Sequence, residues 1–108
     1  MVDKTILLDT PFEMFGKSHR ELVVREPTGG DLFDLGEPTQ ISRAPDGTFY
    51  EVEFVSVIRQ YASRLIRHEG GENVLKLLSL QDAKKIKEAI LDFFTAAAQA
   101  NIKKSATS

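Results

Sequence analysis

The chain of 108 residues contains no cysteine and no tryptophan, and only four prolines. The lack of cysteine excludes disulfide bonds, thiolate zinc sites and thiol catalysis, and it leaves the redox compartment undetermined. No stretch approaches the roughly 20 consecutive apolar residues of a membrane span, and residues 1–5 lack the basic and apolar regions of a secretory signal. The net charge of −2 does not favour nucleic-acid binding. We therefore expect a soluble, cytoplasmic protein.

The hydrophobic content of 42% is sufficient for one modest core without metals or disulfides. Residues 1–102 are predicted to form a single domain, and the small, polar residues 103–108 a flexible C-terminal tail. Charge is unevenly distributed, because residues 1–37 are net acidic and residues 38–108 net basic. Such polarity can align self-association, although ordinary solvated surfaces explain it as well.

The first 25 residues have the pattern of a β-hairpin. Apolar side chains occupy alternate positions of residues 5–14, which is the period of a half-buried strand: Ile6, Leu8, Phe12 and Met14. Pro11 interrupts the ladder and predicts an edge strand or a bulge. Gly16 permits the positive φ of a tight turn, and Arg20–Arg25 returns as the second strand.

A helix-initiating segment follows the hairpin directly. Pro27 cannot donate a hydrogen bond to a sheet ladder, so the second strand ends before it. Thr28 can accept a bond from the backbone N–H of Asp31, and the Asp31 carboxylate can accept one from the N–H of Thr28. We assign Pro27, Thr28 and Asp31 to architecture and not to a binding site.

Four helical segments are predicted after this point, at about 31–35, 51–68, 72–78 and 79–100. The beginning of the second also alternates like a strand, and a turn at Ala44–Gly47 allows a small hairpin between Ile41 and Tyr50. The last helix is the longest. Ser79 and Asp82 repeat the capping pattern at its start, and its predicted core stripe is Ala83, Ile86, Ile90, Phe93, Phe94 and Ala97. The predicted fold class is α+β, with an N-terminal hairpin packed against about three helices.

No set of residues predicts catalysis or a cofactor. His19 lies among polar residues at a hairpin edge and is interpreted as a surface residue. His68, Glu69 and Glu72 could together contact a metal, but a solvated helix end explains them better, since no further His or Cys completes a zinc shell. We therefore predict that the protein is not an enzyme and holds no cofactor or metal.

The long C-terminal helix offers the sharpest indication of a protein partner. Phe93 and Phe94 are adjacent and cannot point in one direction, and Leu91 departs further from the stripe. A helix that is apolar on more than one side is either sandwiched in the fold or contacts another protein. As a hypothesis, Leu91 and Phe94 are the first partner-binding residues, and the face of the middle helix around Arg64 is second.

In order, these pieces resemble the tail assembly chaperone family of Mu-like and P2-like contractile-tailed phages and prophages. The resemblance lies in Arg25–Leu32 ("REPTGGDL"), in Leu77–Asp82 and in the terminal "DFF" at Asp92–Phe94. It implies a non-enzymatic role in the bacterial host cell: binding the tape measure protein before tail tube protein polymerises around it. Further implied partners are the tail tube protein and second copies of the chain.

Two alternatives remain open on the sequence. One is a structural tail completion or connector subunit of the virion. The other is a small nucleic-acid-binding regulator, which a basic cluster on the middle helix suggests: Arg59, Arg64, Arg67 and His68. This alternative is less favoured, because the cluster lacks the exposed aromatic residues that stack on bases.

Overall fold

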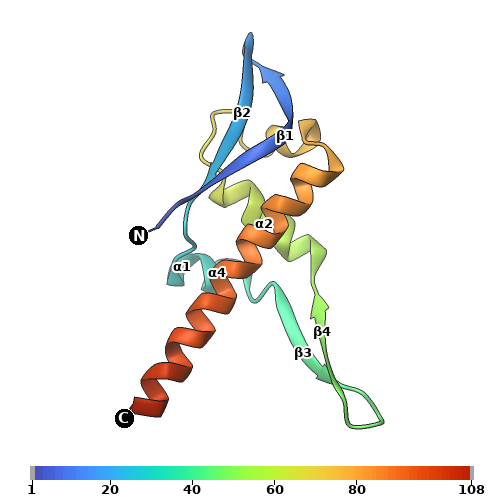
Figure 1. Cartoon of the computed structure of the whole chain (residues 1–108), viewed down its shortest axis with the longest axis vertical. Coiled ribbons are helices and arrows are strands. Elements are labelled where there is room, and N and C mark those ends of the chain that lie inside the picture. Colours follow the sequence, from blue (N-terminus) through green and yellow to red (C-terminus); the bar gives the residue numbers. More distant parts are fainter. Residues whose placement is uncertain (1, 108) are drawn as a thin grey trace.

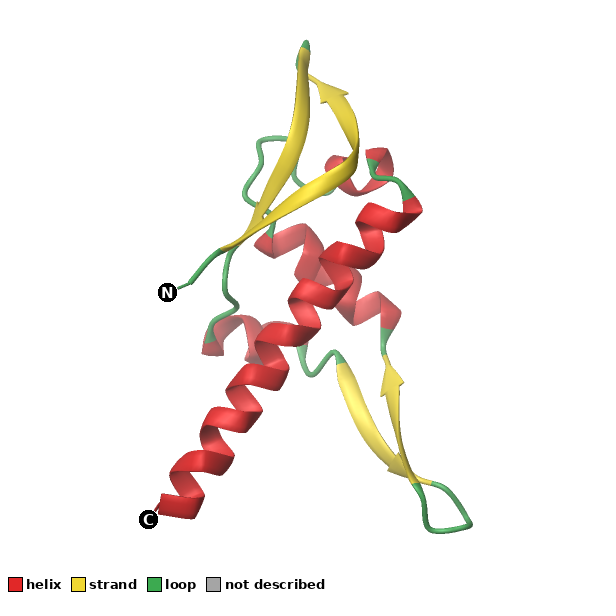
Figure 2. Ribbon diagram, in the orientation of Figure 1, coloured by secondary structure: helices red, strands yellow, loops and turns green. Residues whose placement is uncertain are grey.

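The computed structural model describes residues 2–107 and has an α+β fold, as predicted. In chain order the elements are β1 (Lys4–Met14), β2 (Lys17–Val24), α1 (Gly29–Leu35), β3 (Thr39–Arg43), β4 (Phe49–Glu53), α2 (Val55–Leu65), α3 (Asn73–Leu77) and α4 (Leu80–Thr107). The β1–β2 hairpin, α2, α3 and the first half of α4 form a body, from which the end of α4 and the β3–β4 hairpin project separately (Figure 1). Figure 2 shows the same arrangement by element type.

The N-terminal hairpin is present with the predicted turn at Gly16 and the predicted bulge, but β2 begins at Lys17, three residues before its predicted start. Met14 pairs with Lys17, so Phe15 and Gly16 form a two-residue loop in which both have positive φ, at 56° and 72°. The two strands are in antiparallel register except between Leu7 and Phe12. Pro11 lies in this interval, because it lacks the N–H that a regular ladder requires.

The core lies between the hairpin, α2 and α4. Its buried members are Phe12, Leu22, Val24, Tyr61, Ala62, Leu65, Ile66, Val74, Ile86, Ile90 and Phe93. The Tyr61 hydroxyl donates a hydrogen bond to the carbonyl of Gly36 at 2.7 Å, which holds the end of α1 against α2. The end of the Met14 side chain lies directly against Gly70, so a Cβ there would displace it.

The predicted start and end of the middle helix were wrong. Residues 51–53 belong to β4, where Glu51 pairs with Ile41 and Val52 with Gln40, and α2 begins only at Val55. The alternation in this segment therefore indicated the strand. After Leu65 the chain extends alongside β2, and the N–H of Arg67 donates to the carbonyl of Val23 at 2.9 Å. Pairing with the hairpin thus ends the helix before His68.

The long helix α4 differs from its prediction in length and in part of its buried stripe. Ile86, Ala89, Ile90 and Phe93 are buried, whereas Ala83 and Ala97 are exposed. The helix continues to Thr107 and does not end near Ala100. Residues 103–107, predicted as a flexible tail, are therefore helical in this structure, and Ser108 lies outside the described residues.

Candidate protein-interaction surface

The predicted capping box at the start of α1 is present. The N–H of Thr28 donates to Asp31 Oδ2 at 2.8 Å, and the N–H of Asp31 donates to Thr28 Oγ1 at 3.3 Å. Arg25 adds two charge-assisted bonds to the Asp31 carboxylate, at 2.8 and 3.2 Å. Arg25, with smaller contributions from Thr28 and Arg64, holds the pKa of the buried Asp31 well below its usual range, against the effect of burial. Pro27 lies in the connection between β2 and α1, directly before the cap residue Thr28. All three residues therefore belong to the segment that starts α1.

Arg64 is engaged by the same network. One of its guanidinium nitrogens lies 2.9 Å from Asp34 Oδ2 and 3.3 Å from Asp31 Oδ1. These bonds, the one from Asp34 first, raise the pKa of Arg64. The Arg64 side chain therefore connects α2 to α1.

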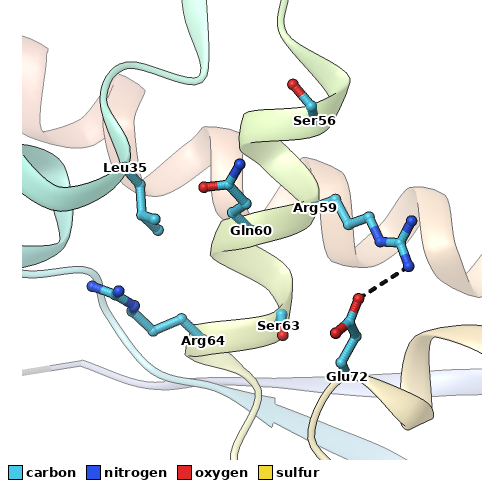
Figure 3. A pocket seen from close by; sticks show the side chains of 7 residues that line it. All are labelled: Leu35, Ser56, Arg59, Gln60, Ser63, Arg64 and Glu72. Atoms are coloured by element: carbon cyan, nitrogen blue, oxygen red, sulfur yellow. Dashed lines mark hydrogen bonds and ion pairs between the residues drawn. The ribbon is translucent and has the colours of Figure 1, made fainter.

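Arg64 also borders a polar hollow along α2. Figure 3 shows this hollow, which is lined by Leu35, Ser56, Arg59, Gln60, Ser63, Arg64 and Glu72. At its other end Arg59 pairs with Glu72 at 3.0 Å. Because both cations already face carboxylates, the hollow has no uncompensated positive charge for an anionic ligand.

Phe94 and Leu91 do not join Arg64 in one surface. The Phe94 ring is half-buried and meets the Tyr61 ring edge-on, with centroids 5.1 Å apart. Phe94 also lines a cleft between the start of α1 and α4, together with Pro27, Thr28 and Phe93. Leu91 is half-buried and lies outside the lining of that cleft. The partner-binding role of these residues remains a prediction.

The most apolar concavity is a groove between α2, α3 and α4 that the sequence pattern did not reveal. Its apolar lining consists of Val55, Ile58, Ala62, Leu75, Leu78, Ala83, Ile86 and Ile90, and its volume is about 400 Å³. Val55 at its mouth is 71% exposed. Among residues 2–107, its charged lining residues are three cations, Arg59, Lys76 and Lys87. Arg59 is paired with Glu72 and Lys87 with Glu53, each at 3.0 Å, whereas Lys76 has no ion pair within these residues. Apolar side chains beside one cation that has no carboxylate partner are suited to an amphipathic helix with an acidic residue next to its apolar stripe.

The two histidines lie together, which the sequence did not indicate. His19 is half-buried and stacks on Phe12 with ring centroids 5.0 Å apart, so its interpretation as a plain surface residue was wrong. His68 meets His19 edge-on at 4.6 Å, and its Nδ1 accepts a bond from the N–H of Gly70. Among residues 2–107 no group of three or more His, Asp or Glu side chains is arranged to hold a metal.

Asp82 is the other important residue whose role sequence reasoning missed. Its carboxylate is fully buried and accepts the N–H groups of Asp9 and Thr10, at 2.7 and 3.0 Å, where β1 leaves its ladder. Ser79 Oγ donates to the same carboxylate and accepts the N–H of Asp82, as the predicted cap requires. Burial alone raises the pKa of Asp82. The hydrogen bonds to its carboxylate together lower the pKa by more, so the net shift is downward.

The described residues thus form an α+β domain with an apolar groove between helices, which is a geometry typical of protein-interaction surfaces. Comparisons with protein-family models, with curated proteins and with solved structures find no match to this chain. No helix among residues 2–107 is long and apolar enough to cross a membrane.

Proposed function

We propose that this protein is a non-enzymatic tail assembly chaperone of a contractile-tailed phage or prophage, acting on the tape measure protein. The proposal is supported by the resemblance in Arg25–Leu32 and Asp92–Phe94. The first of these segments forms the α1 cap and the second packs α4 into the core. These motifs therefore support a likeness of fold, and the function needs a separate physical argument.

The apolar groove between α2, α3 and α4 carries that argument. A tape measure protein that is not yet enclosed by its tube exposes apolar faces of long helices. Such a face presents side chains at i, i+3, i+4 and i+7, which a groove between helices can receive. Lys76 lines the groove without an ion-pair partner among residues 2–107, and it favours a helix with an acidic residue beside its apolar stripe.

The size of the groove suits a contact that can be released. A volume of about 400 Å³ accepts a few side chains, each contributing about 1.5–3 kcal/mol when fully buried. Lost translational freedom and side-chain ordering offset much of this gain. Single contacts are therefore weak, and several copies along one tape measure protein hold it by avidity until tube protein displaces them.

The test is co-purification of the tape measure protein from the same genome with the tagged chain. Ala83→Glu fills part of the groove with a larger, charged side chain at an exposed helical position. We expect retention of the tape measure protein to fall at least about tenfold, because the apolar face of the partner helix must then cover a carboxylate. Ala96→Glu is the matched control, because it makes the same change on α4 outside the groove lining. Equal retention by the two variants contradicts the groove as the binding site.

Leu91→Asp distinguishes the groove from the face of α4 around Leu91 and Phe94, which the sequence predicted as the binding site. Leu91 is half-buried on α4 and does not line the groove. Loss of retention in Leu91→Asp but not in Ala83→Glu moves the binding site to that face of α4. If neither the wild type nor any variant retains or solubilises the tape measure protein, the proposed function is wrong.

A structural subunit of the virion is the second candidate. The end of α4 and the β3–β4 hairpin project from the body (Figure 1), and exchange of an identical element between protomers is a low-cost route to assembly. A chaperone is expected to be absent from purified particles, and a completion or connector subunit to be present. Mass spectrometry of purified virions decides between them.

A further inference from the structure

The β3–β4 hairpin is a separate two-stranded sheet that projects from the body (Figure 1). At its base the N–H of Phe54 donates to the carbonyl of Pro38 at 2.8 Å. Two-stranded sheets are marginally stable in water unless something covers one face. The composition of the two faces therefore indicates what covers this hairpin.

The outer part of one face of the hairpin combines two apolar side chains with two opposite charges. Thr39 and Glu53 lie on the same face nearer the base, where Glu53 is paired with Lys87 at 3.0 Å. Ile41 pairs with Glu51, and Arg43 pairs with Phe49. Paired residues, and residues two apart on one strand, point to the same face, so these four side chains form one patch. Ile41 is 62% exposed and Phe49 71% exposed.

The charges of this patch have no ion-pair partner within the part of the chain that the structure describes. The Arg43 guanidinium lies 5.8 Å from the centre of the Phe49 ring. In the patch Ile41 and Phe49 lie diagonally opposite each other, and Arg43 and Glu51 lie on the other diagonal. The other face carries Gln40, Ser42, Tyr50 and Val52, which have no charge to direct a partner.

We propose that this patch is a twofold interface between two copies of the chain. A twofold interface brings residue i against residue j of the second copy and j against i. With the axis along the apolar diagonal, Ile41 and Phe49 meet their equivalents, and each Arg43 meets the Glu51 of the other copy. The dimer thus contains two Arg43–Glu51 pairs and leaves neither charge unpaired, whereas a partner carrying a single sign of charge leaves one of them unpaired.

Charge reversal provides the test, on the purified chain alone. Arg43→Glu places a carboxylate against Glu51 of the second copy, and Glu51→Arg places a guanidinium against Arg43. Since the patch is small compared with a standard interface, sedimentation velocity should extend to concentrations of about 1 mM. We expect a wild-type dimer, and in each single variant a dimer dissociation constant at least about tenfold higher.

Mixing the two single variants gives the decisive result. Across the axis of the mixed dimer, the carboxylate introduced at position 43 of one variant faces the guanidinium introduced at position 51 of the other. The native Glu51 of the first variant likewise faces the native Arg43 of the second, so a heterodimer should form with a lower dissociation constant than either variant shows alone. The double reversal in one chain should also restore the dimer. Gln40→Glu, on the other face, is the control and should leave dimerisation unchanged.

Three results would overturn the proposal: a wild-type chain that is monomeric throughout, a dimer that neither single reversal weakens, or a mixture that stays monomeric. Circular dichroism melts confirm that each variant is folded, and the mixing result does not require either one to dimerise alone. The tape measure protein is absent from this experiment, so its outcome is independent of the proposed chaperone function.

Discussion

Replacing Asp82 should reveal how strongly the fold depends on one buried carboxylate. Asp82 is the point at which the start of α4 meets β1, more than 70 residues away in sequence, through bonds to the N–H groups of Asp9 and Thr10. Asp82→Ala removes both acceptors and also the partner of Ser79 Oγ. Asp82→Asn keeps the side-chain shape but replaces one acceptor oxygen by an amide donor.

The expected cost follows from the bonds that are lost. A hydrogen bond to a charged group contributes about 1.5–3 kcal/mol, and a donor left without a partner loses a comparable amount. Asp9 and Thr10 are themselves exposed, so water can reach part of the vacated site and reduce the loss. We therefore expect Asp82→Ala to lower the free energy of unfolding by about 3 kcal/mol and Asp82→Asn by about half as much.

Urea unfolding followed by circular dichroism is the suitable measurement, because the chain has no tryptophan for fluorescence. A loss of about 3 kcal/mol lowers the thermal midpoint of a domain of this size by roughly 10–20 °C. Asp92→Asn is the control on the same helix, because the Asp92 side chain is 68% exposed and makes only a weak ion pair, with Lys4 Nζ no closer than 4.0 Å. If Asp82→Ala costs no more than Asp92→Asn, the buried bonds do not stabilise the fold as argued.

Two further predictions concern the carboxylates and the α1 cap. Thr28→Ala should cost about 1 kcal/mol in urea unfolding, as lost caps do, and a cost no greater than that of Thr95→Ala, an exposed position on α4, would argue against the cap. The pKa values of Asp31 and Asp82 are both lower in the folded state, so their stabilisation is complete above the ordinary carboxyl pKa of about 3.9 and declines as pH falls below it. The stability difference between wild type and Asp82→Asn should therefore shrink between pH 6 and pH 2.5, and a constant difference would refute this linkage.

Local features were predictable from the sequence because neighbouring residues determine them. The hairpin turn needs only the positive φ that Gly16 accepts, and the α1 cap needs only Thr28 and Asp31 three residues apart. Pro11 indicated the bulge for the same reason, because a proline has no N–H to donate to the ladder at that position. These predictions required no knowledge of the distant chain.

Features that depend on distant segments were not predictable in the same way. Asp82 was expected only to cap its helix, and nothing near it in sequence indicated the bonds to β1. The contact between His19 and His68 depends on how the chain after α2 returns to β2. The start of α2 was also misjudged, because β3 decides whether residues 51–53 form a strand.

The predicted partner-binding face of α4 illustrates why an open surface is hard to locate from large apolar residues. Phe93 is covered by the core and by Lys4, whose Nζ lies 4.3 Å from the ring centre, and Phe94 is half-covered by Tyr61. Large apolar side chains on two sides of a helix are covered by other segments of the same chain, as Phe93 and Phe94 are. The groove exists instead where small ones, Ala62 and Ala83, leave space between α2 and α4. The binding site for a partner helix is therefore best sought where alanine side chains next to the core leave room for the side chains of another helix.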